Sequence, residues 1–234
     1  QRSRPLAQLP RVVQFAPPSG RDPVRALMPI DPASGGTWVA VNDAGLAVAL
    51  LNVNRQYVSA SPPPRSRGEI VPMLAAMTSL DAMVDAARAL DRGQYQPFRL
   101  VCAGWRRVVE IDPHLGVIDE LPTRDPLMFT SSGLGDDLVE EPRRQLFAEL
   151  VGSASANSQA SAQDRFHAHR WESMPHVSVF MSRDDASTVS RTVVEIGPER
   201  LRMIYAAAPE WTPSEVELAP VPSARRAQRE DNSR

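Results

Sequence analysis

The 234-residue chain contains no lysine, because all 26 of its basic residues are arginine. This absence excludes a P-loop nucleotide site and any reaction through a lysine Schiff base. A single cysteine, Cys102, excludes an internal disulfide, a zinc finger and a CxxC redox motif. No apolar run approaches the roughly 20 residues that span a bilayer, and no signal peptide is visible. We therefore expect a cytoplasmic protein without a membrane span.

The charge and composition are those of an ordinary soluble domain, with 42% hydrophobic and 23% charged residues. A net charge of −2 provides no basic field for nucleic acid or an anionic membrane. The length suits one domain, which we place at residues 1–212, and the proline-rich, then charged residues 213–234 are expected to form a disordered tail. The 22 prolines, the many alanines and the arginine bias are typical of a GC-rich bacterial genome.

Hydrophobic patterning predicts hairpins that alternate with pairs of helices. Residues 1–32 are rich in proline and arginine and are expected to be an extended, loop-like lead-in. The expected strands are 37–42, 46–52, 98–104, 106–111, 176–181, 192–196 and 201–207; the expected helices are 70–77, 80–90, 137–151 and 164–172; and 152–163 is expected to be a linker. This order favours antiparallel sheets covered by helices, in a layered sandwich.

Most residues that could carry chemistry have a simpler structural interpretation. Cys102 lies within an apolar strand pattern, so we expect it in the core rather than as a nucleophile. The four histidines lack the spacing of a metal site. The acidic residues of 136–141 could bind a divalent cation, but a helix start favours them in any case. The glycines of 133–135 lack the remainder of a dinucleotide or phosphate motif. We therefore expect no metal and no cofactor.

Asn52 is the exception, because it ends an otherwise apolar strand and Asn54 follows on the same side. A carboxamide at the rim of a buried strand can donate a hydrogen bond to a developing oxyanion. An asparagine at a strand end can equally serve a turn. The residues alone leave both interpretations open.

Four blocks of this sequence, in the same order, resemble the NRDE family of transport and Golgi organisation proteins, which is named for an Asn-Arg-Asp-Glu tetrapeptide. The most specific block is residues 35–42 (GGTWVAVN) followed by Gly45 and by Leu50, Leu51 and Asn52. The weaker blocks are residues 66–69 (SRGE), 130–132 (TSS), and 183–186 (RDDA) with 188–190 (TVS).

The NRDE family is similar to the N-terminal nucleophile (Ntn) hydrolases, especially the choloylglycine and penicillin V acylases. The resemblance implies an α+β fold, a four-layer αββα sandwich of two antiparallel sheets. It also implies that Asn52 helps to form an oxyanion hole. The implied substrate-binding residues are Trp38, Ser66, Arg67, Ser131, Ser132 and Gly133.

The sequence departs from that pattern in three places. Such hydrolases use an N-terminal cysteine as nucleophile, whereas this sequence opens on Gln1. The NRDE block would immediately precede Gln1, so we expect that about twenty residues with the first strand and the nucleophile are absent. Ser131 and Ser132 end the third block where acylases have asparagine, and Ser187 stands where relatives have arginine.

Two functions follow as hypotheses. The first is an ancestral hydrolase of linear amide or acyl bonds, inactive in the sequence as given because it lacks the nucleophile. The second is a non-catalytic binding or trafficking domain for a small hydrophobic ligand such as haem or lipid. Both predict a small-molecule partner, and neither predicts the oligomeric state.

Overall fold

The computed structural model describes residues 7–16, 23–54 and 64–222. Its larger sheet has seven strands in chain order, and each strand is antiparallel to its neighbours. The strands are β1 (Gln8–Phe15), β2 (Val24–Ile30), β3 (Val39–Asn42), β4 (Ala47–Asn52), β5 (Phe98–Ala103), β6 (Val108–Asp112) and β7 (Val117–Leu121). The predicted hairpin of β3 and β4 forms around Gly45, whose φ of 76° suits glycine.

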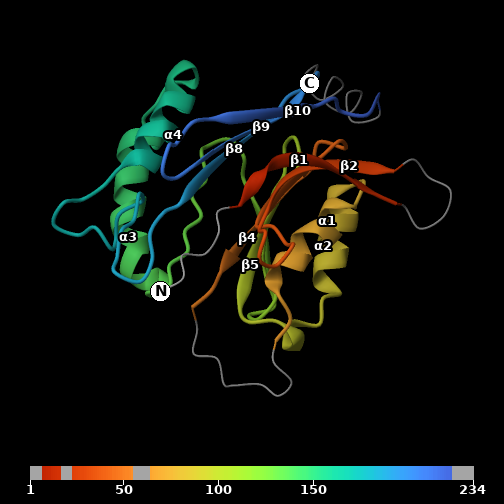
Figure 1. Ribbon diagram of the computed structural model, residues 1–234, viewed down its shortest axis with the longest axis horizontal. Helices are drawn as coiled ribbons and strands as arrows, with labels where there is room; N and C mark the ends of the chain where they lie inside the picture. Colours follow the sequence, from red (N-terminus) through yellow and green to blue (C-terminus); the bar gives the residue numbers. More distant parts are fainter. Residues whose placement is uncertain (1–6, 17–22, 55–63, 223–234) are drawn as a thin grey trace.

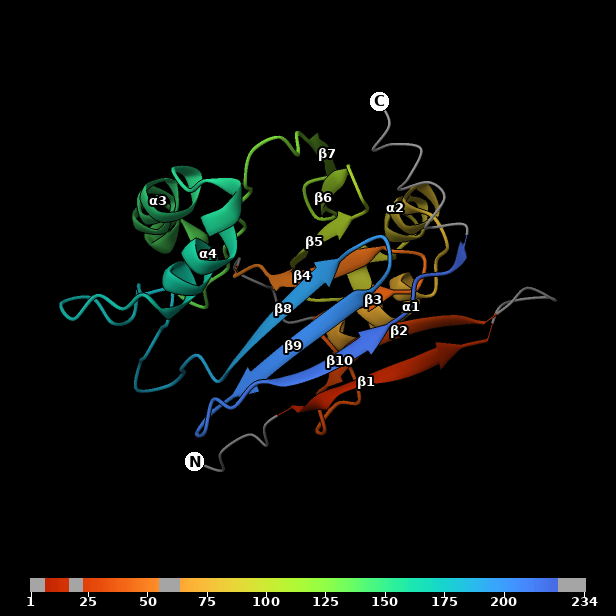
Figure 2. The ribbon, with the colours of Figure 1, turned by 90° about the horizontal axis from the view of Figure 1, so that it is seen from above.

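A second antiparallel sheet of three strands packs across the first (Figures 1 and 2). Its order is β10 (Ser214–Leu218), β9 (Leu201–Ala207) and β8 (Ser190–Ile196). Leu27 and Val41 of the larger sheet are fully buried against Leu201 and Met203 of β9. Side chains alternate along a strand, so the neighbours of Leu27 and Val41 face the opposite side of the larger sheet.

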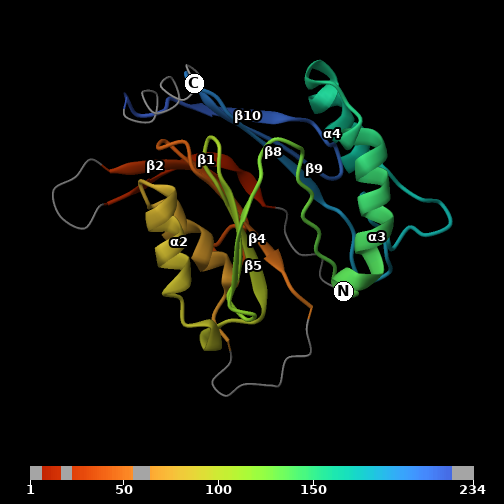
Figure 3. The ribbon, with the colours of Figure 1, turned by 180° about the vertical axis from the view of Figure 1, so that it is seen from behind.

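Two helices, α1 (Ile70–Ala75) and α2 (Leu80–Arg88), cover that opposite face (Figure 3). Ile70 and Leu74 of α1 and Met83 of α2 are fully buried there, as their helical spacing predicts. The predicted N-cap of α2 is present, since the Ser79 hydroxyl accepts a hydrogen bond from the Ala82 N–H at 3.2 Å. A short 3₁₀ turn, Arg67–Glu69, precedes α1, and another, Arg92–Gln94, follows α2.

A second helix pair stands beside β8, away from α1 and α2 (Figure 1). It consists of α3 (Asp136–Phe147), a π turn (Ala148–Gly152), a 3₁₀ turn (Ala156–Ser158) and α4 (Gln159–Ala168). These helices have a small core of their own, formed by Leu146, Val151, Ala162 and Phe166. The predicted α+β fold class with two antiparallel sheets is confirmed.

The expectation of a loop-like lead-in at 1–32 is wrong for most of the described residues of that segment, because β1 and β2 lie in it. Pro10 misled the prediction, since proline is unfavourable within a sheet. Strand β1 is an edge strand, and its register with β2 shifts between Gln8 and Arg11, where Pro10 lies. An edge or a bulge is where a sheet tolerates proline.

Three other expectations need correction. The predicted strand at 176–181 forms turns instead, because carbonyls of this segment bond to Arg143 rather than to a neighbouring strand. The predicted linker at 152–163 includes the start of α4. The predicted tail includes β10, whose Leu218 is buried between the sheets. Residues 223–234 of that tail lie outside the described residues.

Among the helices of the described ranges, none combines the length and the hydropathy of a membrane span.

Candidate functional site

A cleft of about 430 Å³ opens at the end of β4, beside the start of β3. Trp38, Leu50 and Asn52 line it from the larger sheet, and the segment 64–68 lines it from across. Four of the predicted site residues therefore surround one cavity: Trp38, Asn52, Ser66 and Arg67. Their roles remain predictions, but the structure brings them together from segments that are distant in sequence.

A close backbone approach holds the segment 66–68 against the sheet. The Thr37 N–H donates to the Gly68 carbonyl at 3.0 Å, and the Ser66 hydroxyl caps the turn by accepting from the Gly68 N–H at 3.3 Å. A Cβ atom on Gly36 would lie 2.6 Å from the carbonyl carbon of Gly68. Glycine at position 36 is thus required for the segment 66–68 to pack this closely against the residues before β3.

We expect Gly36→Ala to lower the free energy of unfolding by about 1–3 kcal/mol, because the added methyl group meets backbone that must move. Gly104→Ala is the matched control, since a Cβ there has ordinary contacts of 3.6 Å or more. Urea unfolding of both variants measures the difference. An equal effect of the two substitutions would contradict the close approach.

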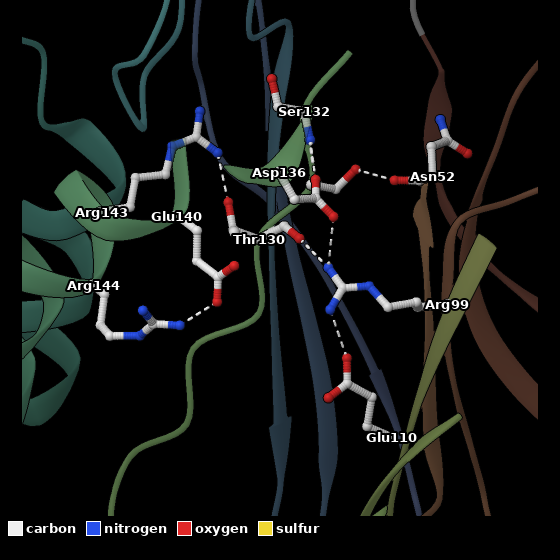
Figure 4. A network of polar contacts seen from close by, with 10 residues as sticks. Asn52, Arg99, Glu110, Thr130, Ser132, Asp136, Glu140, Arg143 and Arg144 are labelled. Carbon is white, nitrogen blue, oxygen red and sulfur yellow. Dashed lines mark hydrogen bonds and ion pairs between the residues drawn. The ribbon is translucent and has the colours of Figure 1, made fainter. Parts of the chain in front are cut away.

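Asn52 is the last residue of β4, and its side chain is exposed at the cleft. Its carboxamide makes no hydrogen bond to any of the described residues, whereas its backbone carbonyl accepts from the Ser131 hydroxyl at 2.5 Å (Figure 4). The amide N–H groups are therefore available to a ligand. The turn interpretation of Asn52 finds no support in these contacts.

The loop containing Ser131, Ser132 and Gly133 lies next to this strand end but is not among the described residues that line the cleft. The Gly133 carbonyl accepts a hydrogen bond from the Asn54 side chain. The Ser132 N–H donates to the Asp136 carboxylate at 3.0 Å, which ties the loop to the start of α3. These hydrogen bonds account for the conformation of the loop without a ligand. The predicted contact of Ser131, Ser132 and Gly133 with a substrate remains a prediction.

Comparison with known proteins decides the family. The family model described as Transport and Golgi organisation 2 (TANGO2) matches residues 11–202. The chain belongs to the TANGO2 family. The resemblance predicted from the sequence blocks is thereby confirmed.

Solved structures similar to this TANGO2-family chain include two variant forms of conjugated bile acid hydrolase from Clostridium perfringens. Each is 10% identical to it, with TM-scores of 0.47 and 0.44. The alignments cover 89% and 90% of this chain and 83% of each hydrolase chain. No curated protein sequence matches the chain.

Three of the acidic residues in the first half of α3, Asp136, Glu140 and Glu141, pair with arginines. Asp136 and Asp137 lie in the first turn of α3, as helix capping predicts. Asp136 is 3.1 Å from the Arg99 guanidinium, and Glu140 pairs with Arg144. Within residues 7–16, 23–54 and 64–222, no group of three or more His, Cys, Asp or Glu side chains is arranged to hold a metal ion.

Cys102 lies in the middle of β5 and is completely buried in this TANGO2-family fold. Burial raises the pKa of its thiol to about 12. A thiol with so high a pKa is almost entirely protonated at neutral pH, so Cys102 is not a nucleophile.

We accordingly expect Cys102 of the native protein to resist a thiol reagent such as iodoacetamide at pH 8. The same reagent should modify it completely in guanidinium chloride, where the side chain is exposed and its pKa returns to the usual range. Intact mass measured over time distinguishes the two states. Fast alkylation of the native protein would show that the thiol is accessible.

A second cavity, of about 510 Å³, lies on the other side of β3 and β4, between the two sheets. Trp38 lines both cavities, and Phe180 and Trp211 join it in the second. His167 of α4 also lines the second cavity, and its pKa is lowered chiefly by burial and further by the Arg191 guanidinium. No sequence pattern selects Phe180, His167 or Trp211, because these residues come together only through tertiary packing.

Proposed function

We propose that the cleft at Trp38, Asn52 and Arg67 binds a small acyl or amide compound, as the ligand-binding part of an amide-hydrolase-like site. The observation that carries this proposal is the convergence of these residues on one cavity. Trp38 offers an aromatic wall, and Asn52 offers an amide donor without an internal partner among the described residues. A concave site with a few converging polar groups is the usual form of a small-molecule site.

In a hydrolytic reaction Asn52 would donate to the carbonyl oxygen as it becomes an oxyanion. One such donor typically stabilises the transition state by about 3–4 kcal/mol. Among the described residues that line the cleft there is no cysteine and no histidine. Hydrolysis would also need a nucleophile, which the family resemblance assigns to an N-terminal cysteine.

Binding can be tested without the nucleophile. The purified chain is titrated with a panel of N-acyl amino acids, fatty-acyl amides and simple amides, and binding is followed by isothermal titration calorimetry. We expect at least one class to bind and Asn52→Ala to weaken it, while the exposed Asn157→Ala serves as control. Absence of binding by the whole panel, or equal binding by both variants, would reject the proposal.

The second cavity favours a second candidate function, the carriage of a small apolar ligand such as haem or a lipid. Its walls are largely apolar, with Val39, Ala49 and Val179 beside the aromatic residues. Haem is tested by titration with its absorption spectrum as the signal, and a lipid by displacement of a fluorescent fatty acid. An unchanged haem spectrum together with no displacement would exclude this function.

A further inference from the structure

Among the described residues, two arginines line the first cleft, and only one of them forms an ion pair with another described residue. Arg65 forms an ion pair with Glu69 at 2.6 Å and donates to the Gln94 side chain at 3.1 Å. Its guanidinium also lies 5.7 Å from the centre of the Tyr95 ring. The charge of Arg65 is therefore compensated within the fold.

Arg67 differs from Arg65 in each of these respects. It is half-buried, and its one hydrogen bond to a described residue runs from Nη1 to the Pro97 carbonyl at 2.7 Å. No carboxylate among the described residues forms an ion pair with it. Burial lowers the pKa of Arg67, but a guanidinium stays protonated at any physiological pH. The cleft therefore contains a permanent positive charge that the described residues leave uncompensated.

Asp31 is the one carboxylate among the described residues that line this cleft. It is engaged in its own turn, where it accepts from the Ala33 N–H at 2.9 Å and from the Ser34 hydroxyl at 3.0 Å. These bonds orient the carboxylate toward residues 33–34. No ion pair joins Asp31 to Arg67.

We infer that Arg67 binds the carboxylate of an anionic ligand in this cleft. A partly buried cation is stabilised when an anion accepts its remaining N–H groups, and the planar guanidinium matches a carboxylate in a two-bond geometry. A carboxylate bound by Arg67, an acyl oxygen bound by the Asn52 amide and an apolar group against the Trp38 ring together describe an acylated small carboxylic acid. An N-acyl amino acid is one example. The inference rests on the proposed function, because it names the substrate class of the same cleft.

The test compares matched ligands on matched variants. An N-acyl amino acid and its uncharged carboxamide are titrated into the wild-type chain, Arg67→Gln and, as control, Arg92→Gln, which removes an exposed arginine that also donates to a proline carbonyl, that of Pro113, at 2.9 Å. Glutamine at position 67 removes the charge and keeps an amide N–H donor on a shorter side chain. We expect Arg67→Gln to weaken binding of the acid by about 10- to 100-fold and to leave the carboxamide unchanged. Arg92→Gln should change binding of neither ligand by more than about threefold, because Arg92 is exposed and is not among the described residues that line the cleft.

Raising the salt concentration should weaken binding of the acid to the wild-type chain and leave the carboxamide unaffected. Equal losses for acid and carboxamide, or an acid that binds Arg67→Gln as tightly as wild type, would overturn the inference. If the carboxamide still binds in that case, and Asn52→Ala weakens its binding, the proposed function remains supported. If neither ligand nor any other member of the acyl and amide panel binds, the proposed function itself fails.

Discussion

Replacement of Asn42 by alanine is expected to lower the free energy of unfolding by about 3–5 kcal/mol. The side chain is completely buried at the end of β3 and makes four hydrogen bonds. Its amide donates to the carbonyls of Ala75 and Met77, at 3.0 and 2.7 Å. Its oxygen accepts from the N–H groups of Ala44 and Leu46, both at 3.1 Å.

These bonds join a hairpin turn to the C-terminal end of α1. The last carbonyls of a helix have no partner within it, so Asn42 provides one for this helix. Alanine would leave two carbonyls and two N–H groups buried without partners, and each such group costs about 1–3 kcal/mol before the structure relaxes. Asn157→Ala at an exposed site is the control and should change stability by less than about 0.5 kcal/mol.

Asn42→Asp is expected to lower the stability of the protein by an amount that depends on pH. Aspartate keeps the acceptor oxygens but places a buried negative charge against the carbonyls of Ala75 and Met77, so its pKa in the folded state is raised. Between the pKa of unfolded aspartate and the raised pKa of the folded state, unfolding releases a proton, so the stability of the variant falls as pH rises through this range and is lowest above the folded-state pKa. It should regain stability relative to wild type as pH falls, which urea unfolding at pH 7 and pH 5 can measure. A stability difference independent of pH would show that the carboxylate reaches water.

Local patterns predicted the parts of the fold that local interactions determine. The hairpin of β3 and β4 follows from strand-forming residues around Gly45, and α2 follows from its apolar stripe and the Ser79 cap. The segment 176–181 has the same kind of apolar alternation but is not a strand. Its carbonyls at Val177 and Ser178 bond to Arg143, at a separation of more than 30 residues, and no local pattern contains such a contact.

The candidate site also combines features that a local sequence pattern predicts with features that arise only from contacts between distant segments. Trp38 and Asn52 could be selected because they lie in the most specific sequence block. The charge of Arg67 could not be interpreted from sequence, because it depends on tertiary contacts: Arg67 donates to the Pro97 carbonyl, and no carboxylate among the described residues forms an ion pair with it. Gly36 lies in the same block, but its approach to Gly68 arises from tertiary packing, which no local pattern predicts.

The second helix pair is joined to the larger sheet by a polar network (Figure 4). Arg99 of β5 donates to Glu110 of β6 at 2.8 Å, to the Thr130 carbonyl at 2.6 Å and to Asp136 of α3 at 3.1 Å. Arg143 of α3 donates to the Thr130 hydroxyl at 2.7 Å. The Leu146–Phe166 core of these helices is separate from the core under α1 and α2. Ion pairs and hydrogen bonds therefore contribute much of the connection between these two units.

We expect Arg99→Met to lower the free energy of unfolding by about 2–4 kcal/mol, because it leaves Glu110 and Asp136 without their partner. Arg107→Met is the matched control: Arg107 also pairs with two acids, Asp81 and Glu120, but its side chain is 45% exposed against 21% for Arg99. Exposed pairs contribute little, so this control should cost less than about 1 kcal/mol.

Hydrogen exchange locates the effect of Arg99→Met and separates this account from general destabilisation. If the network fastens α3 and α4 to the sheet, their amides should lose protection in Arg99→Met at denaturant concentrations where β4 and β5 remain protected. Arg107→Met should leave the order of exchange unchanged. An equal loss of protection in α3, β4 and β5 would instead mean that the two units unfold together, and that their separate cores are coupled by more than this network.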